Sequence, residues 1–240
     1  MAKQTVRFIK SEEVAEGTRA FHFEKPAGFE YKAGQTLDLT IPNPPETDAE
    51  GNTRAFSIAH APHEGDLMIA TRMRDTAFKR VLGKLEAGAP LEIDGPFGSF
   101  TLHNDTKKAA VFLTGGIGVT PIRAILFDAK ERKLAHRILV FYSNRRPEDA
   151  AFLSELTALV KDMPTVTFVP TMTDMEKSAQ PWSGATGYVT KEMILKELPD
   201  VSNAIFYLDG PASMVAAMRK ILSEMQVDDD NIRTEEFAGY

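Results

Sequence analysis

The chain has 240 residues, which is enough for one large domain or two small ones. Hydrophobic residues make up 43% and charged residues 26%, a balance that argues against extensive disorder. The absence of cysteine excludes disulfides, cysteine nucleophiles and cysteine-held zinc or iron–sulfur sites within these residues. The formal net charge of -6 argues against a nucleic-acid-binding surface. We expect no membrane span and, because residues 1–14 lack the apolar core of a signal peptide, a cytoplasmic protein.

The sequence before residue 105 consists of short β-type runs separated by Gly, Pro and Asn. Several runs alternate apolar and polar residues, as in Leu37, Leu39 and Ile41 against Asp38 and Thr40. We expect strands near residues 4–10, 18–24, 35–41, 54–60, 66–72 and 90–94. Strands at this spacing predict an antiparallel barrel or sandwich.

One helix is expected to interrupt these strands near residues 76–85, because its apolar residues recur at helical spacing. Asp75 or Thr76 can cap the first turn of this helix. Residues 42–52 are rich in proline and polar residues, so we expect them to form a long exposed loop.

After residue 108 the pattern changes to strand, glycine turn, helix, strand and helix. Residues 109–114 are continuously apolar, as expected for a parallel strand covered on both faces. Further strands are expected near residues 137–142, 165–170 and 204–208, with helices after 120, at about 148–161 and after 211. This alternation predicts a doubly wound parallel sheet. The polar segment 101–108 is the expected hinge.

The strongest single motif is TGGIGVTP at residues 114–121, between an apolar strand and an amphipathic helix. Glycines let the backbone approach an anion closely, and a helix N-terminus offers unpaired N–H groups. Thr120 can cap this helix, and Pro121 suits its first turn. A nucleotide pyrophosphate fits such a site; the alternative is a tight strand–helix turn without a ligand.

Three weaker motifs have chemistry that suits a second nucleotide. Residues 54–57 (RAFS) offer a guanidinium, an aromatic ring and a hydroxyl in a predicted strand. Residues 72–80 (RMRDTAFKR) place four cations around a helix start. Asp209-Gly210-Pro211, with Met214, follows a predicted parallel strand, where ligands bind in open α/β sheets. Taken alone, each of these motifs also fits an ordinary structural role.

Two further signals are not expected to carry function. His60 and His63 lie three residues apart without an obvious third ligand, so the sequence predicts no metal site. Tyr188 and Lys191 form Y-x-x-K, one residue short of the pattern of short-chain dehydrogenases.

In this order and spacing the fragments resemble the ferredoxin–NADP reductase superfamily. Residues 54–57 resemble its R-x-[YF]-[ST] flavin motif, and residues 115–121 resemble its G-G-x-G-x-[TS]-P nucleotide turn. Residues 209–214 resemble its C-G-P-x-x-M motif, with aspartate in place of cysteine. Further matches are Gly34-Gln35, Gly95-Pro96-Phe97-Gly98 and Glu236-Phe237. The resemblance covers residues 4–240.

The resemblance implies a six-stranded Greek-key β-barrel that binds FAD in residues 1–104 and a Rossmann-like α/β domain that binds NAD(P)H in residues 105–240. The residues implied in catalysis are Ser57, facing flavin N5, together with Asp209 and Glu236. The other residues implied in FAD binding are Arg54, for the pyrophosphate, and Ala55, Phe56, Thr71, Arg72, Thr76, Ala77, Phe78, Phe237 and Tyr240. The residues implied in NAD(P)H binding are Gly116, Gly118, Thr120, Pro121, Arg145, Arg146, Gly210, Pro211 and Met214.

Two positions bear on coenzyme chemistry. Asp209 stands where the family has a cysteine beside the nicotinamide, so a carboxylate there would add charge and hydration. Arg145 and Arg146 follow the second α/β strand, where arginines suit a 2′-phosphate and an acidic residue suits the hydroxyls of NAD. The pair therefore favours NADPH over NADH, with the alternative that both arginines face solvent.

The resemblance implies an FAD-dependent enzyme that takes hydride from NAD(P)H onto flavin N5 and passes electrons to a separate acceptor. That acceptor would be a ferredoxin-like protein or an oxygenase component. Two alternatives stay open: a reductase of free flavin or quinone, and a non-catalytic nucleotide-binding subunit that kept the fold.

Overall fold

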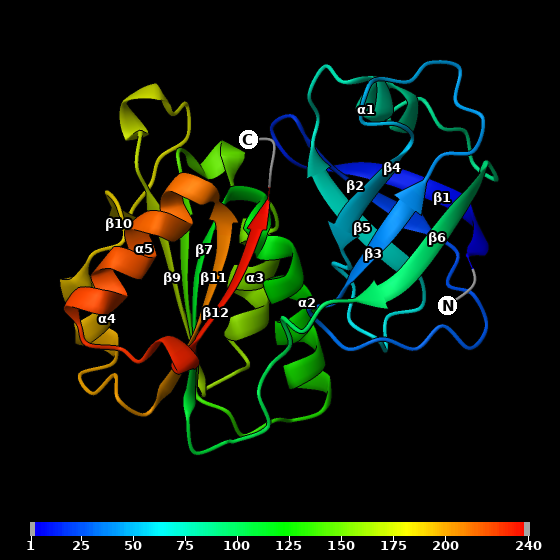
Figure 1. The fold of residues 1–240 in the computed structure, drawn as a ribbon. Helices are drawn as coiled ribbons and strands as arrows, with labels where there is room; N and C mark the ends of the chain where they lie inside the picture. Colours follow the sequence, from blue (N-terminus) through cyan, green and yellow to red (C-terminus); the bar gives the residue numbers. More distant parts are fainter. Residues whose placement is uncertain (1–2, 238–240) are drawn as a thin grey trace.

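In the computed structural model, which describes residues 3–237 and only the backbone of 236 and 237, the chain forms two six-stranded sheets (Figure 1). The first sheet is antiparallel, with the order β4-β3-β6-β1-β2-β5. Its strands are β1 (Gln4–Ala15), β2 (Thr18–Phe23), β3 (Thr36–Thr40), β4 (Thr53–Ser57), β5 (Leu67–Arg72) and β6 (Pro90–Phe97). The edge strands β4 and β5 contact each other, so the sheet curls into a half-barrel.

The half-barrel encloses its own apolar core, which contains Phe21, Leu37, Leu39 and Ile69, each at most 1% exposed. Helix α1 (Ala77–Leu82) is capped by Thr76, whose hydroxyl accepts a hydrogen bond from the Lys79 N–H. This barrel and its helix confirm the predicted architecture of the first half of the chain. Strand β4 ends at Ser57, earlier than predicted, because the Ile58 and Ala59 amides bond to Gln35 and Met68 instead.

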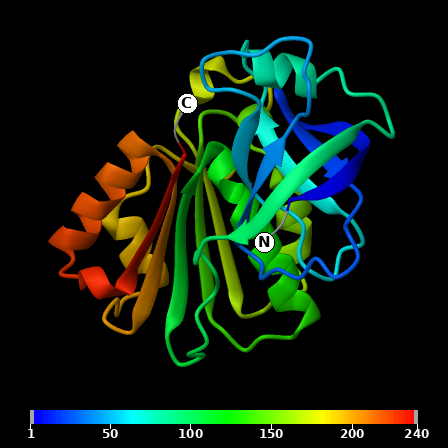
Figure 2. The same ribbon diagram turned by 45° about the vertical axis from the view of Figure 1, so that its right-hand side comes forward.

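The second sheet is parallel, with the order β10-β9-β8-β7-β11-β12. Its strands are β7 (Ala109–Gly115), β8 (Ile138–Asn144), β9 (Val166–Met172), β10 (Ala185–Thr186), β11 (Ala204–Pro211) and β12 (Ile232–Phe237). Helices α2 (Val119–Glu131) and α3 (Leu153–Val160) cover the face toward the half-barrel, and α4 (Lys191–Glu197) and α5 (Ala212–Glu224) cover the other (Figure 2). The predicted doubly wound sheet is confirmed.

Hydrophobic periodicity in the sequence does not predict three elements of this half. Strands β10 and β12 are short or polar edge strands, each paired on one side only, and α4 is a helix of seven residues. Helix α3 starts at Leu153 rather than near 148, because Pro147–Asp149 form a separate 3-10 turn and Phe152 has φ = 58°. None of the helices in residues 3–237 is long and apolar enough to cross a membrane.

The segment expected to be the hinge packs on the second sheet. His103 is 7% exposed, and its backbone N–H donates to the Tyr207 hydroxyl on β11 at 2.9 Å. The His103 carbonyl lies 2.8 Å from Nε2 of His136. These contacts hold the middle of the connecting segment against the α/β half.

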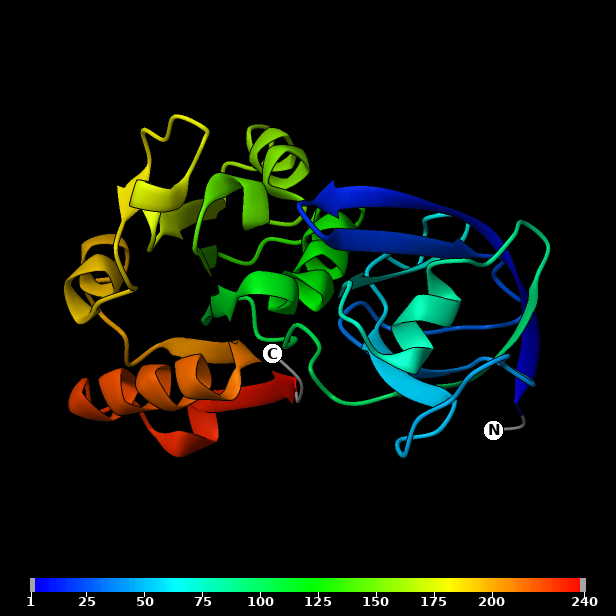
Figure 3. The same ribbon diagram turned by 90° about the horizontal axis from the view of Figure 1, so that it is seen from above.

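A continuous apolar core joins the two halves. Ala20, Ala59 and Met68 of the half-barrel belong to the same buried cluster as Ile122 and Ile125 of α2. Seen from above, α2 lies between the parallel sheet and the half-barrel (Figure 3). Because this interface is apolar and continuous, the two halves are held in one relative orientation.

Arg123 crosses this interface and is 3% exposed. From α2, its guanidinium donates to the Ala59 carbonyl at 3.0 Å and to both oxygens of Glu64 at 3.0 and 3.1 Å. It also bonds to Glu155 of α3 at 2.6 and 2.8 Å. Burial alone would raise the pKa of Glu64, but the hydrogen bonds and charge of Arg123 hold it below its usual range.

We expect Arg123→Ala to lower the free energy of unfolding by about 3 kcal/mol, because it leaves Glu64 as an uncompensated, largely buried carboxylate. Urea denaturation measures this change. Arg132→Ala on the same helix is the control, because Arg132 forms an exposed pair with Asp128 that contributes at most about 1 kcal/mol. Equal losses in the two variants would contradict the role assigned to Arg123.

Candidate nucleotide-binding site

A cleft of about 660 Å³ opens at the C-terminal edge of the parallel sheet. It is lined by the turns that follow β7, β8, β9 and β11 and by two arginines from the half-barrel. Its lining residues include Arg72, Arg74, Gly115, Gly116, Ser143, Asn144, Arg145, Asp149, Thr173, Tyr188, Pro211, Ser213 and Met214. Four residues of the predicted NAD(P)H set therefore line it, namely Gly116, Arg145, Pro211 and Met214.

The glycine turn lets β7 approach the turn after β11. A Cβ on Gly115 would lie 2.3 Å from Sδ of Met214, and one on Gly118 would lie 2.7 Å from the Asp209 carbonyl oxygen. Gly116 has φ = 56°, which favours glycine. A larger side chain at Gly118 would therefore displace the β11 backbone, whereas one at Gly115 would displace the Met214 side chain.

Thr120 does not cap α2, contrary to the sequence prediction. The helix begins at Val119, Gly118 is its N-cap, and no side chain bonds to the first turn. The Thr120 hydroxyl instead donates to the Ile117 carbonyl at 3.0 Å. Four other residues of the predicted NAD(P)H set do not line the cleft, namely Gly118, Thr120, Pro121 and Gly210.

Several buried polar atoms beside the glycine turn have no hydrogen-bond partner. Asp209 on β11 pairs in register with Thr114 on β7 and with Glu235 on β12. Both carboxyl oxygens of Asp209 and the hydroxyl of Thr114 are buried and unpartnered. Burial, and then the charge of Glu235, raises the pKa of Asp209 well above its usual range. Burial at this position therefore disfavours the charged form of Asp209.

The half-barrel presents a second orphaned group on β4. Ser57 is 2% exposed, and its hydroxyl is buried without a partner. Phe56 packs near Phe78 of α1, with ring centroids 6.0 Å apart. The Arg54 guanidinium lies over the Phe78 ring, 5.1 Å from its centroid.

Four cations gather where the half-barrel meets the cleft. Burial lowers the pKa of Lys79, and the positive charges of Arg74, Arg54 and Arg72 lower it further. The Lys79 ammonium also donates to the Arg72 carbonyl at 2.8 Å. Since like charges repel, this arrangement favours a bound anion. Arg72 and Arg74 belong to this cluster and also line the cleft.

Two acidic side chains from the loop 42–52 reach this cationic cluster, because Asp48 and Glu50 each place a carboxyl oxygen 3.0 Å from Nη2 of Arg54. The Arg54 guanidinium donates to Asp48 at 3.0 Å and to the carbonyls of Glu50 and Gly51 at 3.0 Å each. Desolvation opposes the shift, but the hydrogen bonds from Arg54 and the backbone, including the amide of Ala77, hold the pKa of Asp48 below its usual range. The Asp48 carboxylate thus takes a position suited to a phosphate. Sequence reasoning missed it because Asp48 lies six residues from Arg54 in an irregular loop.

The two arginines after β8 have different surroundings. Arg145 lines the cleft. Arg146 pairs with Asp149 at 2.8 Å and with Glu16 of the turn after β1 at 2.9 Å, and it is not among the lining residues. Arg145 is exposed where it lines the cleft, and Arg146 is partly buried in its ion pairs, so for Arg145 both a 2′-phosphate and solvent remain open as surroundings.

The remaining predicted residues lie around α1 and at the end of the chain. Thr71, Ala77 and Phe78 are buried, whereas Ala55 is exposed. The backbone of Glu236 and Phe237 pairs with Gly210 and Pro211 of β11. Their side chains, and the whole of Tyr240, lie outside the described residues. Among residues that the prediction lacked, Asn144 and Tyr188 line the cleft, and Tyr188 is 77% exposed.

Comparison with known proteins adds independent evidence on the fold and the relatives of the chain. The family model described as "Oxidoreductase NAD-binding domain" matches residues 112–220. One component of the Na(+)-translocating NADH-quinone reductase of Klebsiella pneumoniae is 31% identical over 205 residues, or 79% of this chain and 50% of that protein. The reductase component of propane 2-monooxygenase from Rhodococcus jostii is 29% identical over 222 residues, or 90% of this chain and 58% of that protein. The chain thus spans about half the length of these curated relatives.

A solved structure shares the whole two-domain arrangement. The ferredoxin NADP+ reductase of Neisseria gonorrhoeae, with bound FAD and NADP, superimposes with a TM-score of 0.77 and 21% identity. The superposition covers 98% of this chain and 98% of that one. These comparisons confirm the fold and the resemblance to the ferredoxin–NADP reductase superfamily that the sequence predicts.

Glu235 gives the site a pH dependence that can be measured. Burial raises its pKa from 4.5 to about 7. The folded state therefore holds a proton that the unfolded chain releases near pH 4.5, so its stabilising effect is lost as the pH rises through about 7. We expect the thermal midpoint of the wild type to fall over this window more than that of Glu235→Gln. Parallel pH dependences in the two proteins would contradict this assignment.

Proposed function

We propose that this chain, a member of the ferredoxin–NADP reductase superfamily, is an oxidoreductase that uses FAD and NAD(P)H and passes electrons to a separate acceptor. The observation that carries the proposal is that Arg72 and Arg74 belong both to the NAD(P)H-type cleft and to the cationic cluster around Arg54. Two nucleotide sites that share a wall place two dinucleotides side by side, as direct electron transfer between them requires.

The residues of the half-barrel fit FAD. The buried Ser57 hydroxyl has an unused hydrogen-bonding capacity, which suits a ring nitrogen of the flavin. Arg54 and the cations beside it suit the pyrophosphate. When bound, FAD supplies the redox chemistry, accepting two electrons from NAD(P)H and releasing them to an acceptor. The protein contributes orientation and exclusion of water.

Asp209 and Thr114 are the buried polar residues that we assign to the NAD(P)H side of the site. A charged carboxylate at the position of the family's cysteine would bring hydration into the site. Asp209 is 1% exposed, its burial disfavours the charged form, and its carboxyl group and the Thr114 hydroxyl both lack a hydrogen-bond partner. This pair suits the carboxamide of a nicotinamide ring.

For the acceptor we favour an oxygenase component or a similar redox protein. The relative from Rhodococcus jostii is the reductase component of a monooxygenase, and it matches 90% of this chain. A basic docking surface for an acidic ferredoxin has less support, because Arg80 is paired with Glu46 and Asp75. A quinone acceptor is the second candidate, because the relative from Klebsiella pneumoniae is part of an NADH-quinone reductase.

An anaerobic titration tests the proposal. Purified protein reconstituted with FAD should bleach its flavin absorbance on addition of one equivalent of NADPH or NADH. Turnover is then compared with a small iron–sulfur protein, a quinone and free flavin as acceptors. Protein that binds NADPH but neither retains FAD nor reduces it would instead support the non-catalytic alternative.

Ser57→Ala is expected to retain FAD and to slow its reduction by NAD(P)H about tenfold, the worth of one hydrogen bond. Stopped-flow absorbance measures the rate, and the protein-bound FAD content is the companion readout. Ser99→Ala, at an exposed position, is the matched control. A wild-type reduction rate in Ser57→Ala would refute this role.

The Arg54–Asp48 pair gives two opposite expectations. Arg54→Ala should raise the Kd for FAD at least about tenfold, because the pyrophosphate loses a bidentate partner. Asp48→Asn should lower that Kd about threefold, because a competing carboxylate is removed. Fluorescence titration of the FAD-free protein measures both values. Glu46→Gln is the control from the same loop, since Glu46 pairs with Arg80 instead; an effect equal to that of Asp48→Asn would contradict the competition.

Arg145 and Arg146 form a matched pair for coenzyme choice. We expect Arg145→Ala to raise KM for NADPH about tenfold and to leave KM for NADH unchanged, because only the 2′-phosphate is lost as a partner. Arg146→Ala should change neither KM, since Arg146 is engaged by Asp149 and Glu16. Steady-state kinetics with both coenzymes decides. Equal effects on NADPH and NADH would place Arg145 away from the 2′-phosphate.

A further inference from the structure

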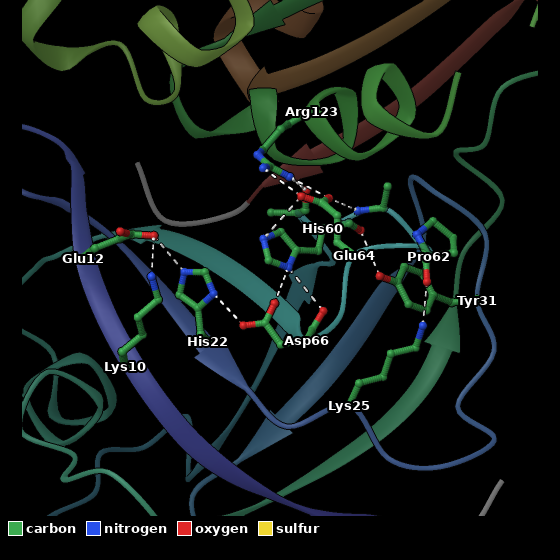
Figure 4. Close-up of polar contacts among 12 residues, drawn as sticks. Lys10, Glu12, His22, Lys25, Tyr31, His60, Pro62, Glu64, Asp66 and Arg123 are labelled. Atoms are coloured by element: carbon green, nitrogen blue, oxygen red, sulfur yellow. Dashed lines mark hydrogen bonds and ion pairs between the residues drawn. The ribbon is translucent and has the colours of Figure 1, made fainter. Parts of the chain in front are cut away.

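Two histidines and an aspartate converge on the half-barrel where it faces the α/β half (Figure 4). His22 lies on β2, and His60 and Asp66 lie on the segment between β4 and β5. His22 Nδ1 is 2.9 Å from one Asp66 carboxyl oxygen, and His60 Nδ1 is 2.6 Å from the other. One ligand atom from each residue lies within 4.8 Å of the other two. The two imidazoles are 4% and 9% exposed.

Each imidazole also faces a second carboxylate through its other nitrogen. His22 Nε2 is 2.9 Å from Glu12, and His60 Nε2 is 3.6 Å from Glu64. A neutral imidazole carries one N–H, and an ionised carboxylate only accepts. If each Nε2–H points to its glutamate, each Nδ1 lone pair faces an Asp66 oxygen. A cation between these three groups removes that repulsion.

We propose that His22 Nδ1, His60 Nδ1 and the Asp66 carboxylate bind a divalent transition-metal ion, with zinc as the best fit. Two imidazoles and one carboxylate are a donor set typical of zinc, whereas magnesium and calcium prefer oxygen ligands. With bonds of about 2.0 Å, tetrahedral ligand atoms lie about 3.3 Å apart. The present separations of 2.9 and 2.6 Å are shorter than this, and His60 Nδ1 also lies 3.2 Å from the Asp66 carbonyl oxygen, so metal binding requires the Asp66 carboxylate to move away from both imidazoles. Water completes the fourth position.

The outer carboxylates have the arrangement that orients metal-bound histidines. A ligating imidazole usually donates its second N–H to a carboxylate, which fixes the ring and makes it more basic. The Glu12 carboxylate lies 2.9 Å from His22 Nε2, where it can accept this N–H, and it also pairs with Lys10 at 3.5 Å. Glu64 lies beside His60 while it accepts both hydrogen bonds from Arg123.

A path for the ion is present. A cleft of about 910 Å³ between the halves is lined by His22 and His60 and by the acidic residues Glu12, Glu13, Glu16, Glu148 and Glu155. Carboxylates at the mouth of a cleft raise the local concentration of cations. His63, the residue that the sequence paired with His60, is exposed and outside the cluster.

This metal site goes beyond the redox function and does not depend on it. His22 and His60 are 38 residues apart in the sequence, and this spacing does not match a recognisable metal-binding motif. Binding would tie β2 to the segment that carries Glu64, so the expected consequence is greater stability of the half-barrel and its interface. The metal site is therefore tested by measuring metal content and resistance to unfolding, and not by measuring electron transfer.

The test is metal titration of the full-length protein after treatment with a chelator, with zinc for calorimetry and cobalt for visible absorption. We expect one ion per chain, an absorption band of tetrahedral cobalt, and a thermal midpoint raised by about 5 °C at a hundredfold excess of zinc over its Kd. Asp66→Asn and His60→Gln should lose binding at least about a hundredfold. His63→Gln is the matched control and should bind as the wild type does.

Glu12→Gln keeps the test decisive if the ligand variants fail to fold, because the Glu12 side chain is 49% exposed. It should weaken zinc binding about tenfold, as expected for loss of an outer carboxylate. The proposal is overturned if the wild type binds no stoichiometric zinc or cobalt, or if a folded Asp66→Asn or Glu12→Gln variant binds as tightly as the wild type.

Discussion

The buried guanidinium of Arg123 is the constraint on which the rest of the structure depends. It comes from the first helix after the glycine turn and reaches the half-barrel at Ala59 and Glu64. The apolar cluster around it supplies most of the attraction between the halves, but apolar contact alone is non-directional. The fixed hydrogen-bond geometry of the guanidinium therefore orients the two halves relative to each other. Together with the pairs Arg146–Glu16 and Arg72–Asp149, this crossing fixes the relative position of the two candidate sites.

Charge is arranged in opposite ways on the two sides of the junction. On the half-barrel side, Arg54, Arg72, Arg74 and Lys79 crowd together, and the Asp48 carboxylate compensates part of that charge. On the α/β side, burial raises the pKa of Asp209 and so disfavours its charged form. A diphosphate is therefore favoured at the first position and an uncharged polar group at the second. This difference matches the proposed arrangement, with the FAD pyrophosphate at the half-barrel and the nicotinamide of NAD(P)H at the α/β half.

The sequence predicts most of the fold, because hydrophobic periodicity and glycine turns are local signals. It predicts the contents of the site less completely, because these depend on contacts across the chain. The turn at 115–118 is readable, yet the short helix α4 and the polar strand β12 are not. Asp48 comes from an irregular loop, and the raised pKa of Asp209 depends on burial within the sheet and then on Glu235 of the neighbouring strand. Nothing in the spacing of His22 and His60 indicates that their rings lie 5.3 Å apart.

Glu64 connects the interface to the histidine cluster. Its carboxylate accepts from Arg123 on one side and faces His60 on the other. Any cation that fixes the orientation of His60 therefore also fixes the loop that presents Glu64 to α2. A positive charge near His60 would attract the carboxylates of Glu64 and Asp66 on the same loop. Removal of Arg123 would take away the partner that competes with His60 for the Glu64 carboxylate. The interface and the cluster are thus coupled through one side chain, and a double-mutant cycle between Arg123 and Asp66 measures that coupling as a departure from additivity.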